Sequence, residues 1–447
     1  MQITRATPVD LDVVVRPIEE LHLDPENARQ HNAGQIRQIA ESIRAFNFNA
    51  PILVDKDLKV IAGHGRLLAA MRLGWKEVPT IRLDHLTPEQ ARAYAIADNR
   101  LTDTSSFDER KLALHFKALA EVDLDFSLEA TGFTMGEIDL KIESLGDLEP
   151  DEPDPDDDPP TAGPPVAEAG DLFVLGDHRL YCGSALDPAA YRVLMNEELA
   201  AAVFVDPPYG GSIKSYLGHK RKSRHREFVQ GSTNMTGPEL ATFLTTSARA
   251  IAEVSAEGSV GFWCIDWRHL EILLAAAGAT YDELLNICVW VKGQGGMGSF
   301  YRSEHELVLV YRKGAGPHRN NVQLGQYGRN RTNVWTYPGA NRFLRSSEEA
   351  DLLAHHPTPK PVTLVADALL DVTCRRDLVL DAFMGSGTTL IACERIGRRC
   401  RGIELDPLYV DLAIRRWQRL TGEAAVHAAS GKTFDELAAQ FELEAAQ

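Results

Sequence analysis

The sequence predicts an α/β chain of two domains, the larger of which is built on a doubly wound parallel sheet. Three observations support this. An apolar run over residues 201–205 ends in Asp206-Pro207-Pro208-Tyr209, which puts an acid and a ring at the carboxyl end of a buried strand. A second strand, over residues 378–380, enters a glycine-rich turn and then a helix. Between the domains, residues 150–165 are rich in proline and aspartate and contain nothing that could anchor a core.

Composition limits the protein class. A chain of 447 residues is too long for one ordinary domain. Its six cysteines show no metal-ligand spacing, which fits a reducing cytoplasm, and we expect no metal. No stretch has the length and apolar character of a membrane span, and the first residues do not resemble a signal peptide.

The net charge of −17 is unevenly distributed. Eight acids and no base lie within residues 147–158, whereas residues 214–226 contain six bases and no acid. Because a polyanion responds to the local field, the overall acidity does not exclude DNA as a partner.

The first element group lies within residues 10–110. Strands are predicted over 13–15, 52–54 and 59–62, and helices over 35–46 and 67–73. A glycine-flanked turn opens the second helix and could receive a nucleotide phosphate or another anion through its N–H groups; its residues are Gly63, His64, Gly65 and Arg66. A tight turn with solvated side chains is the alternative.

These segments resemble the ParB/sulfiredoxin-like domain, also called the ParB-like nuclease domain. The matching pieces include Pro17-Ile18-Glu19-Glu20-Leu21, Asn27-Ala28-Arg29, Ile61-Ala62-Gly63-His64-Gly65-Arg66-Leu67 and Ala97-Asp98-Asn99-Arg100. In that family the Gly-x-x-Arg turn binds nucleotide phosphates in some members, and other members are nucleases or DNA-binding modules. The resemblance leaves CTP, ATP, DNA or no ligand open for this domain.

The remaining chain divides by composition and periodicity. A helical extension is expected over 111–146, a linker over 147–168, a catalytic domain over 169–425 and a helical tail over 426–447. Within the catalytic domain we expect a hairpin over 171–182, helices over 240–252, 270–277 and 362–370, and strands over 259–264, 287–291 and 307–311. Residues 210–235 and 312–345 are expected to be loops.

A strand, glycine turn, helix, strand and acid in succession predict an adenosyl-binding site. The turn Asp381–Thr389 follows the strand 378–380, and Glu404 ends the next strand about twenty residues later. Glycines let a ligand approach the backbone, and an acid at this position can hold ribose hydroxyls. The spacing is not G-x-G-x-x-G, so a dinucleotide is disfavoured.

Together these motifs resemble the DNA amino-methyltransferases, which use S-adenosylmethionine to modify N6 of adenine or N4 of cytosine. The resemblance covers about 170–420 and implies a Rossmann-like methyltransferase sheet with the catalytic motif before the cofactor motif, the permuted order of the β group. It implies catalytic roles for Asp206, Pro207, Pro208 and Tyr209. It implies cofactor contacts from Asp381, Phe383, Gly385, Ser386, Gly387, Thr388, Thr389, Glu404, Thr358, Lys360 and Ser184, the last standing where many members have an aspartate.

The resemblance implies methylation of a flipped-out base in double-stranded DNA, with adenine N6 preferred to cytosine N4. Residues expected to contact DNA are Lys214, Lys220, Arg221, Lys222, Arg224, Arg226, Arg329 and Arg331. A nucleotide- or DNA-binding protein with an inactive methylase half is the alternative from another class. A cytoplasmic location is expected, and a homodimer, a cognate restriction enzyme and a phage origin stay open.

Overall fold

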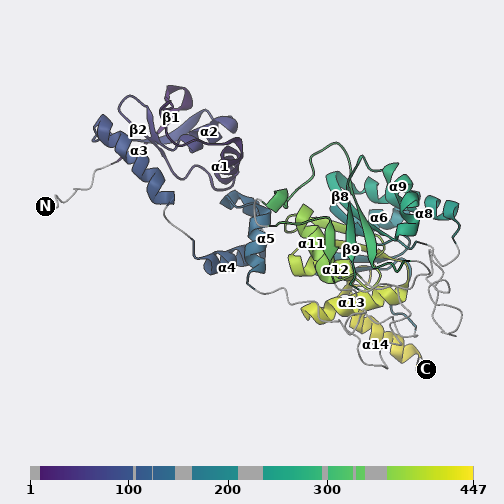
Figure 1. Cartoon of the computed structure of the whole chain (residues 1–447). Coiled ribbons are helices and arrows are strands. Elements are labelled where there is room, and N and C mark those ends of the chain that lie inside the picture. The colour runs from purple at the N-terminus through teal and green to yellow at the C-terminus, as the bar shows by residue number, and fades with distance from the viewer. Residues whose placement is uncertain are drawn as a thin grey trace. The chain divides into compact units, whose positions relative to one another are not determined.

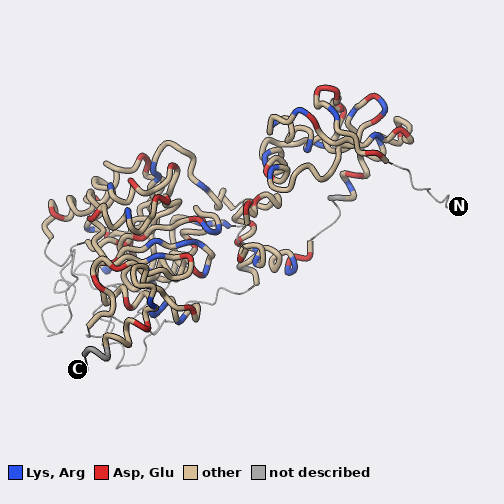
Figure 2. The backbone as a smooth tube through the Cα atoms, turned by 180° about the vertical axis from the view of Figure 1, so that it is seen from behind, with Lys and Arg blue, Asp and Glu red and all other residues tan. Residues whose placement is uncertain are grey.

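The computed structural model describes residues 11–103, 107–122, 124–145, 164–209, 235–293, 301–325, 329–337 and 360–445. The chain forms two compact units, Met1–Asp147 and Leu148–Gln447, which we describe separately (Figure 1). Acidic and basic residues alternate along the described parts of both units (Figure 2). Among the described residues, no helix has the length and apolar character needed to cross a membrane.

The first unit is built on a four-stranded sheet in the order β1-β4-β2-β3. The strands are β1 (Val13–Pro17), β2 (Ile52–Val54), β3 (Val60–Ala62) and β4 (Glu77–Arg82). The helix α2 (His64–Arg72) packs on it, with Ile52, Val54, Leu67 and Val78 in the core, and α1 (Ala33–Phe46) packs against α2. The sequence pattern predicts no strand at β4, because Pro79 interrupts the apolar run there.

Three further helices complete the described part of the first unit. They are α3 (Pro88–Asp103), α4 (Glu109–Ala120) and α5 (Met135–Glu143). The short turn η2 (Leu128–Thr131) lies between α4 and α5, and a second short turn, η1 (Ile18–Glu20), follows β1. Phe116 packs its ring 5.3 Å from that of Phe133. A capping box between Thr134 and Glu137 starts α5.

The second unit contains a ten-stranded sheet in the order β11-β9-β10-β8-β7-β12-β13-β6-β5-β14. Its strands are β5 (Leu172–Leu175), β6 (His178–Cys182), β7 (Ala200–Val205), β8 (Ser255–Ile265), β9 (Glu283–Val291), β10 (His305–Arg312), β11 (Val334–Thr336), β12 (Leu378–Asp381), β13 (Arg399–Glu404) and β14 (Val426–His427). The pairs β6–β13, β13–β12, β12–β7 and β7–β8 are parallel, as the doubly wound prediction requires.

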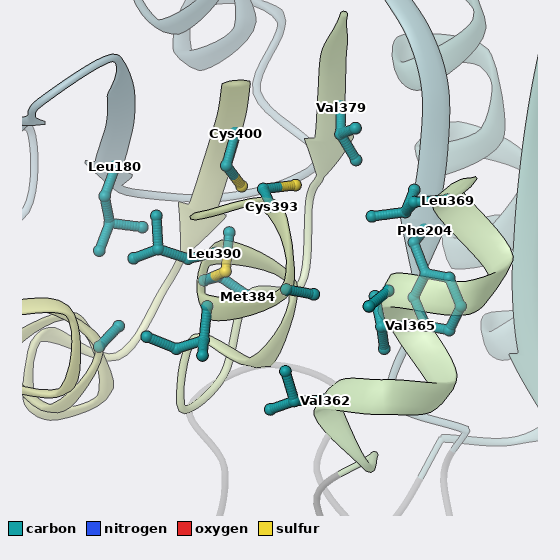
Figure 3. Close-up of a cluster of buried hydrophobic side chains, with 14 of the residues drawn as sticks. Leu180, Phe204, Val362, Val365, Leu369, Val379, Met384, Leu390, Cys393 and Cys400 are labelled. Carbon is teal, nitrogen blue, oxygen red and sulfur yellow. The ribbon is translucent and has the colours of Figure 1, made fainter. Parts of the chain in front are cut away.

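Helices cover both faces of this sheet (Figure 1). On one face lie α6 (Pro188–Met195), α8 (Gly237–Glu253) and α9 (Leu270–Gly278), whose apolar side chains form one core cluster. On the other lie α11 (Val362–Val372), α12 (Thr388–Ile396), α13 (Pro407–Thr421) and α14 (Phe434–Ala445), whose side chains form a second cluster. Figure 3 shows part of this second cluster, where Phe204 lies beside Val365 and Leu390 lies beside Met384.

The strand order reverses between β7 and β12. The chain leaves β7 for β8 in one direction and leaves β12 for β13 in the other. The two strands pair directly, with Ala202 opposite Val379 and Val203 opposite Leu380. Ligands of such sheets bind beyond the carboxyl ends at this switch point, and both predicted motifs begin there.

Two segments differ from the sequence expectations. Residues 426–447 were expected to form a separate tail, yet β14 pairs with β5 in the main sheet and Phe434 is buried in the main core. Within the expected loop 312–345, β11 adds a strand parallel to β9. Both strands are only two or three residues long, too short for a recognisable period in the sequence.

Candidate active site

Asp206 follows β7 at the switch point and lies in an ion pair. Its Oδ2 is 2.5 Å from Nζ of Lys360, a side chain that is itself only 6% exposed. Lys360 Nζ is also 2.9 Å from Oε2 of Glu306, and Oε1 of Glu306 is 2.5 Å from Nζ of Lys292. We call Lys292, Glu306, Lys360 and Asp206 the charge row; its two cations and two anions alternate and balance.

The sheet topology explains how residues far apart in sequence form the charge row. Lys292 directly follows β9, whose neighbour β10 runs antiparallel and begins with His305 and Glu306. The start of β10 therefore lies at the same edge as the carboxyl ends of β8 and β9. Lys360 immediately precedes α11 and reaches the edge from its amino end.

The electrostatics of the charge row favour an ionised Glu306 and a protonated Lys360. Burial alone would raise the pKa of Glu306, but Lys360 and Lys292 hold that pKa below its usual range. Burial would lower the pKa of Lys360, yet Asp206 and Glu306 keep it well above its ordinary value. Burial raises the pKa of Asp206, and the charge of Lys360 opposes that rise.

Asp206 keeps one oxygen available. Its Oδ2 faces Lys360, whereas Oδ1 is buried and has no hydrogen-bond partner among the described residues. The side chain as a whole is 36% exposed, although Oδ1 itself is buried. A buried acceptor without a donor is costly, which makes this oxygen the natural place for an external N–H group.

Tyr209 lies beside the carboxylate. Its ring packs against the cluster formed by α6, α8 and α9, and its centroid is 6.3 Å from that of His269, with the planes inclined by 30°. His269 follows β8 and its Nδ1 lies 2.6 Å from Oδ1 of Asp266. Pro207 is buried between the acid and the ring, which restricts the loop.

The glycine-rich turn is held by Asp381. Its Oδ2 accepts a hydrogen bond from the Thr389 hydroxyl at 2.6 Å, and its Oδ1 accepts one from the Phe383 N–H at 2.9 Å. Burial raises the pKa of Asp381 to about 7. Both oxygens are thus used inside the turn, so the Asp381 side chain braces the predicted cofactor loop.

Gly387 needs its small size and its backbone conformation. It has φ +90°, and a Cβ there would lie 2.9 Å from Cβ of Ala413 on α13. Gly385, with φ +53°, borders open space instead, because a Cβ built on it meets nothing within 4 Å. The turn therefore packs on its inner side and offers a bare backbone on its outer side.

Glu404 lies across the turn from β12. Its Oε2 accepts a hydrogen bond from the Gly385 N–H at 2.7 Å, and its Oε1 accepts one from the Asp406 N–H at 2.8 Å. Burial raises its pKa. An acid beside a bare glycine turn at the start of α12 fits the adenosyl ligand that the sequence predicts.

The other predicted cofactor residues have mixed surroundings. Arg416 donates to the carbonyl and the hydroxyl of Ser386, and Ser184 accepts from the Leu186 N–H with its hydroxyl. Thr388 and Thr389 form the first turn of α12. Lys360 contacts the predicted catalytic acid, and Thr358 lies outside the described residues.

The predicted DNA contacts differ in outcome. The six bases of residues 214–226 lie outside the described residues. Arg329 and Arg331 instead face two acids of α11: Arg329 contacts Asp367 and Asp371 at 3.3 and 3.2 Å, and Arg331 contacts them at 3.1 and 2.9 Å. Arg329 is only 5% exposed, so its guanidinium is enclosed by the fold; the DNA contact of the two arginines stays a prediction.

The anion turn of the first unit is compact. Gly63 has φ +101° and caps α2, while His64 is buried and its Nε2 accepts a hydrogen bond from the Asp24 N–H at 3.4 Å. Arg66 donates to the carbonyl of Pro51 at 3.3 Å and lies over Gly63, where a Cβ would be 3.0 Å from Nη2. The Arg66 guanidinium therefore lies over the turn itself.

Sequence reasoning missed Lys292 and Glu306. Neither residue receives a role from the sequence, where each stands beside an expected strand. The signal in the sequence was a charged residue next to each apolar strand. Lys292 directly follows the strand 287–291, and Glu306 directly precedes the strand 307–311. Asp266 and His269 follow a third strand in the same way.

Comparison with known proteins identifies two family regions. Residues 200–415 match the DNA methylase family of the N6/N4 type, and residues 8–100 match the ParB N-terminal domain. The first match contains β7, the charge row and the glycine turn. The second contains the sheet and the anion turn of the first unit.

Individual relatives fall in the same two classes. The ParB-like nuclease domain-containing protein YnaK of Escherichia coli (strain K12) is 45% identical over 80 residues, 18% of this chain and 92% of that protein. The type II methyltransferase M2.MboI of Moraxella bovis is 29% identical over 146 residues, 31% of this chain and 51% of that protein, so this chain spans about half of its length. Among solved structures, the PvuII DNA methyltransferase (cytosine-N4-specific) is 15% identical with a TM-score of 0.40, covering 61% of this chain and 92% of that one.

Proposed function

Because this chain carries a DNA methylase domain of the N6/N4 family behind a ParB N-terminal domain, we propose that it transfers a methyl group to the exocyclic N6 of adenine in double-stranded DNA. S-adenosylmethionine is the methyl donor. One observation carries the proposal: Asp206 and the glycine turn leave adjacent parallel strands at the switch point. A donor held by the turn and a base held by Asp206 would then meet at one edge.

Asp206 supports this reaction through its unpartnered oxygen. The lone pair of an exocyclic amino group is delocalised into the ring, so the nitrogen is a weak nucleophile. An N–H donated to Asp206 Oδ1, and a second donated to the Pro207 carbonyl, would favour a tetrahedral nitrogen and stabilise its developing positive charge. Lys360 holds the other oxygen and favours the ionised carboxylate.

The bonds and charges balance without a metal. When bound, S-adenosylmethionine supplies a sulfonium methyl, and the carbon–sulfur bond breaks with its electron pair to sulfur as the nitrogen–carbon bond forms. The nitrogen becomes cationic and loses one proton to Asp206. Burial raises the pKa of Asp206, and the charge of Lys360 opposes that rise. Asp206 then returns the proton to water, because its side chain is partly exposed.

Tyr209 supports a base that has left the duplex. Flipping a base costs a few kcal/mol, and an aromatic stacking partner returns about 1 to 3 kcal/mol. The ring is held by the apolar cluster behind it and by His269 beside it, so little side-chain freedom remains to be lost on binding. The tyrosine in Asp-Pro-Pro-Tyr is the feature that favours adenine over cytosine.

Transfer of labelled methyl to unmethylated plasmid DNA, followed by nucleoside analysis, tests the proposal. We expect N6-methyladenine from the wild type and a loss of at least about 100-fold in Asp206→Asn, with donor binding retained. Asp177→Asn is the matched control, because Asp177 lies in the β5–β6 turn at the opposite edge of the sheet. N4-methylcytosine would replace adenine by cytosine as the substrate, and no methylated base would refute the activity.

A further inference from the structure

Trp267 is the most exposed tryptophan of this chain. Of the other five, Trp263, Trp290, Trp335 and Trp417 are at most 5% exposed and Trp75 is 37% exposed, whereas Trp267 is 53% exposed. Tryptophan side chains are enriched where proteins contact partners, because they combine a large apolar face with a polar group. Trp267 lies outside the buried clusters that stabilise the fold.

The Trp267 backbone is fixed by its neighbour. Asp266 caps the short helix η3 (Trp267–His269) and accepts hydrogen bonds from the N–H groups of Arg268 and His269, each at 3.1 Å. It also contacts the Arg268 guanidinium at 3.1 Å and the His269 ring at 2.6 Å. The Arg268 guanidinium lies 5.2 Å from the centre of the Trp267 ring. Backbone and ring are therefore held before any partner arrives.

This short helix borders the place where the target base would bind. Strands β7 and β8 are parallel neighbours, with Val205 opposite Trp263, so Asp206 and Asp266 leave the same edge. The ring of His269 lies 6.3 Å from that of Tyr209. Trp267 thus stands at the rim of the site, two residues from a side chain that touches the catalytic motif.

Flipping a base creates a need for such a group at the rim. When one base leaves the stack, its two neighbours lose stacking surface and its former partner loses its base-pair hydrogen bonds. An aromatic face placed at the gap recovers part of that loss for any base, since every base offers a π-face. Proteins that hold duplexes open commonly insert or stack an apolar side chain at the gap.

We propose that Trp267 stacks on a nucleobase uncovered when the target base leaves the duplex, with Arg268 holding the ring and facing the nearby phosphates. The proposal rests on the DNA methylation proposed above and adds a residue that favours the opened duplex. Its partner is a base of the duplex around the target, whereas Tyr209 receives the target base itself.

The test compares Trp267→Ala with the wild type on a duplex taken from a site that the wild type methylates. The loss of one stacking partner should raise the KM for that duplex about 10-fold, with S-adenosylmethionine binding unchanged. The same duplex with a mismatched target base is easier to open, so most of the loss should disappear on it. A 2-aminopurine target should report less flipping in the variant by its weaker fluorescence.

Trp267→Phe keeps a stacking face and should recover most of the activity. Leu324→Ala is the matched control, because Leu324 is 98% exposed and the nearby Asn321 binds the carboxyl end of α11, at the opposite edge of the sheet. An unchanged KM in Trp267→Ala, or equal losses on paired and mismatched duplexes, would overturn the proposal. A wild type that methylates no DNA would instead refute the proposed function.

Discussion

Replacing Lys360 with methionine is expected to move the acid limb of the methylation profile to higher pH. Methionine has a similar length and no charge, so the charge row keeps two anions and one cation. Asp206 must be ionised to accept the amino group, and activity is therefore lost as the pH falls through its pKa. Without Lys360 only the weaker effect of Lys292 opposes burial, so that pKa rises further.

The size of the shift follows from the contact. An opposite charge within about 4 to 6 Å changes a carboxyl pKa by about 1 to 3 units, and Lys360 lies at 2.5 Å. Because the Asp206 side chain is 36% exposed, solvent screens part of the interaction, and the lower half of that range is expected. The assay is kcat/KM for methyl transfer against pH, which reports the free enzyme.

Glu306→Gln provides a test of opposite sign. It leaves two cations and one anion in the charge row, and Glu306 normally raises the pKa of Asp206, so the acid limb should move to lower pH. The shift should be smaller, because Lys360 lies between the two acids. Lys59→Met is the control; it removes a surface ion pair at 3.0 Å in the first unit and should leave the limb in place. Shifts of the same sign in both variants would refute the role of the charge row.

Three further changes test the structure around the site. Gly387→Ala combines a left-handed φ with a contact of 2.9 Å to Ala413, so it should lower the free energy of unfolding by about 1 to 3 kcal/mol and weaken donor binding, as measured by thermal melting and titration. Arg329→Met removes one of the two arginines that contact Asp371, and Arg331 remains at 2.9 Å. It should therefore lower the free energy of unfolding in urea by about 1 to 3 kcal/mol and leave the salt dependence of DNA binding unchanged. A reduced salt slope would instead support the DNA contact predicted from the sequence. The pKa of Asp381 is raised to about 7, so near neutral pH the folded state holds a proton that the unfolded chain releases. The stability that this bound proton adds is lost as the pH rises from about 4 to 7. Asp381→Asn should remove this pH dependence of the free energy of unfolding, as measured by unfolding across the same range.

The site could be predicted where a motif carries its own geometry. Asp206 and the glycine turn each follow an apolar strand, and parallel strands place such ends at one edge. Their direct pairing was within reach because the switch point of a doubly wound sheet brings distant strands together. The balance of charges around Asp206 could not be predicted, because Glu306 lies on β10, an antiparallel strand inserted between β8 and β9.

Arg329 and Arg331 illustrate the opposite case. Two arginines in an irregular, polar segment are typical of a nucleic-acid contact. Their partners Asp367 and Asp371 lie about 40 residues later, four apart on one face of α11, and nothing in the local sequence couples the two segments. Only the three-dimensional fold shows that these charges neutralise one another.

Among the described strands of the second unit, β5 is the first along the chain and β14 is the last, and the two are hydrogen-bonded neighbours. Val426 of β14 lies opposite Val174 of β5. A peptide that runs from the end of α14, which follows β14, to the residues before β5 could join the two, and the chain could be opened elsewhere, for example between β10 and β11, without breaking any strand pair. The order of the catalytic and cofactor motifs would then be exchanged while every contact of the site stayed in place. In this fold, the order of the two motifs along the chain therefore does not determine how the site is assembled.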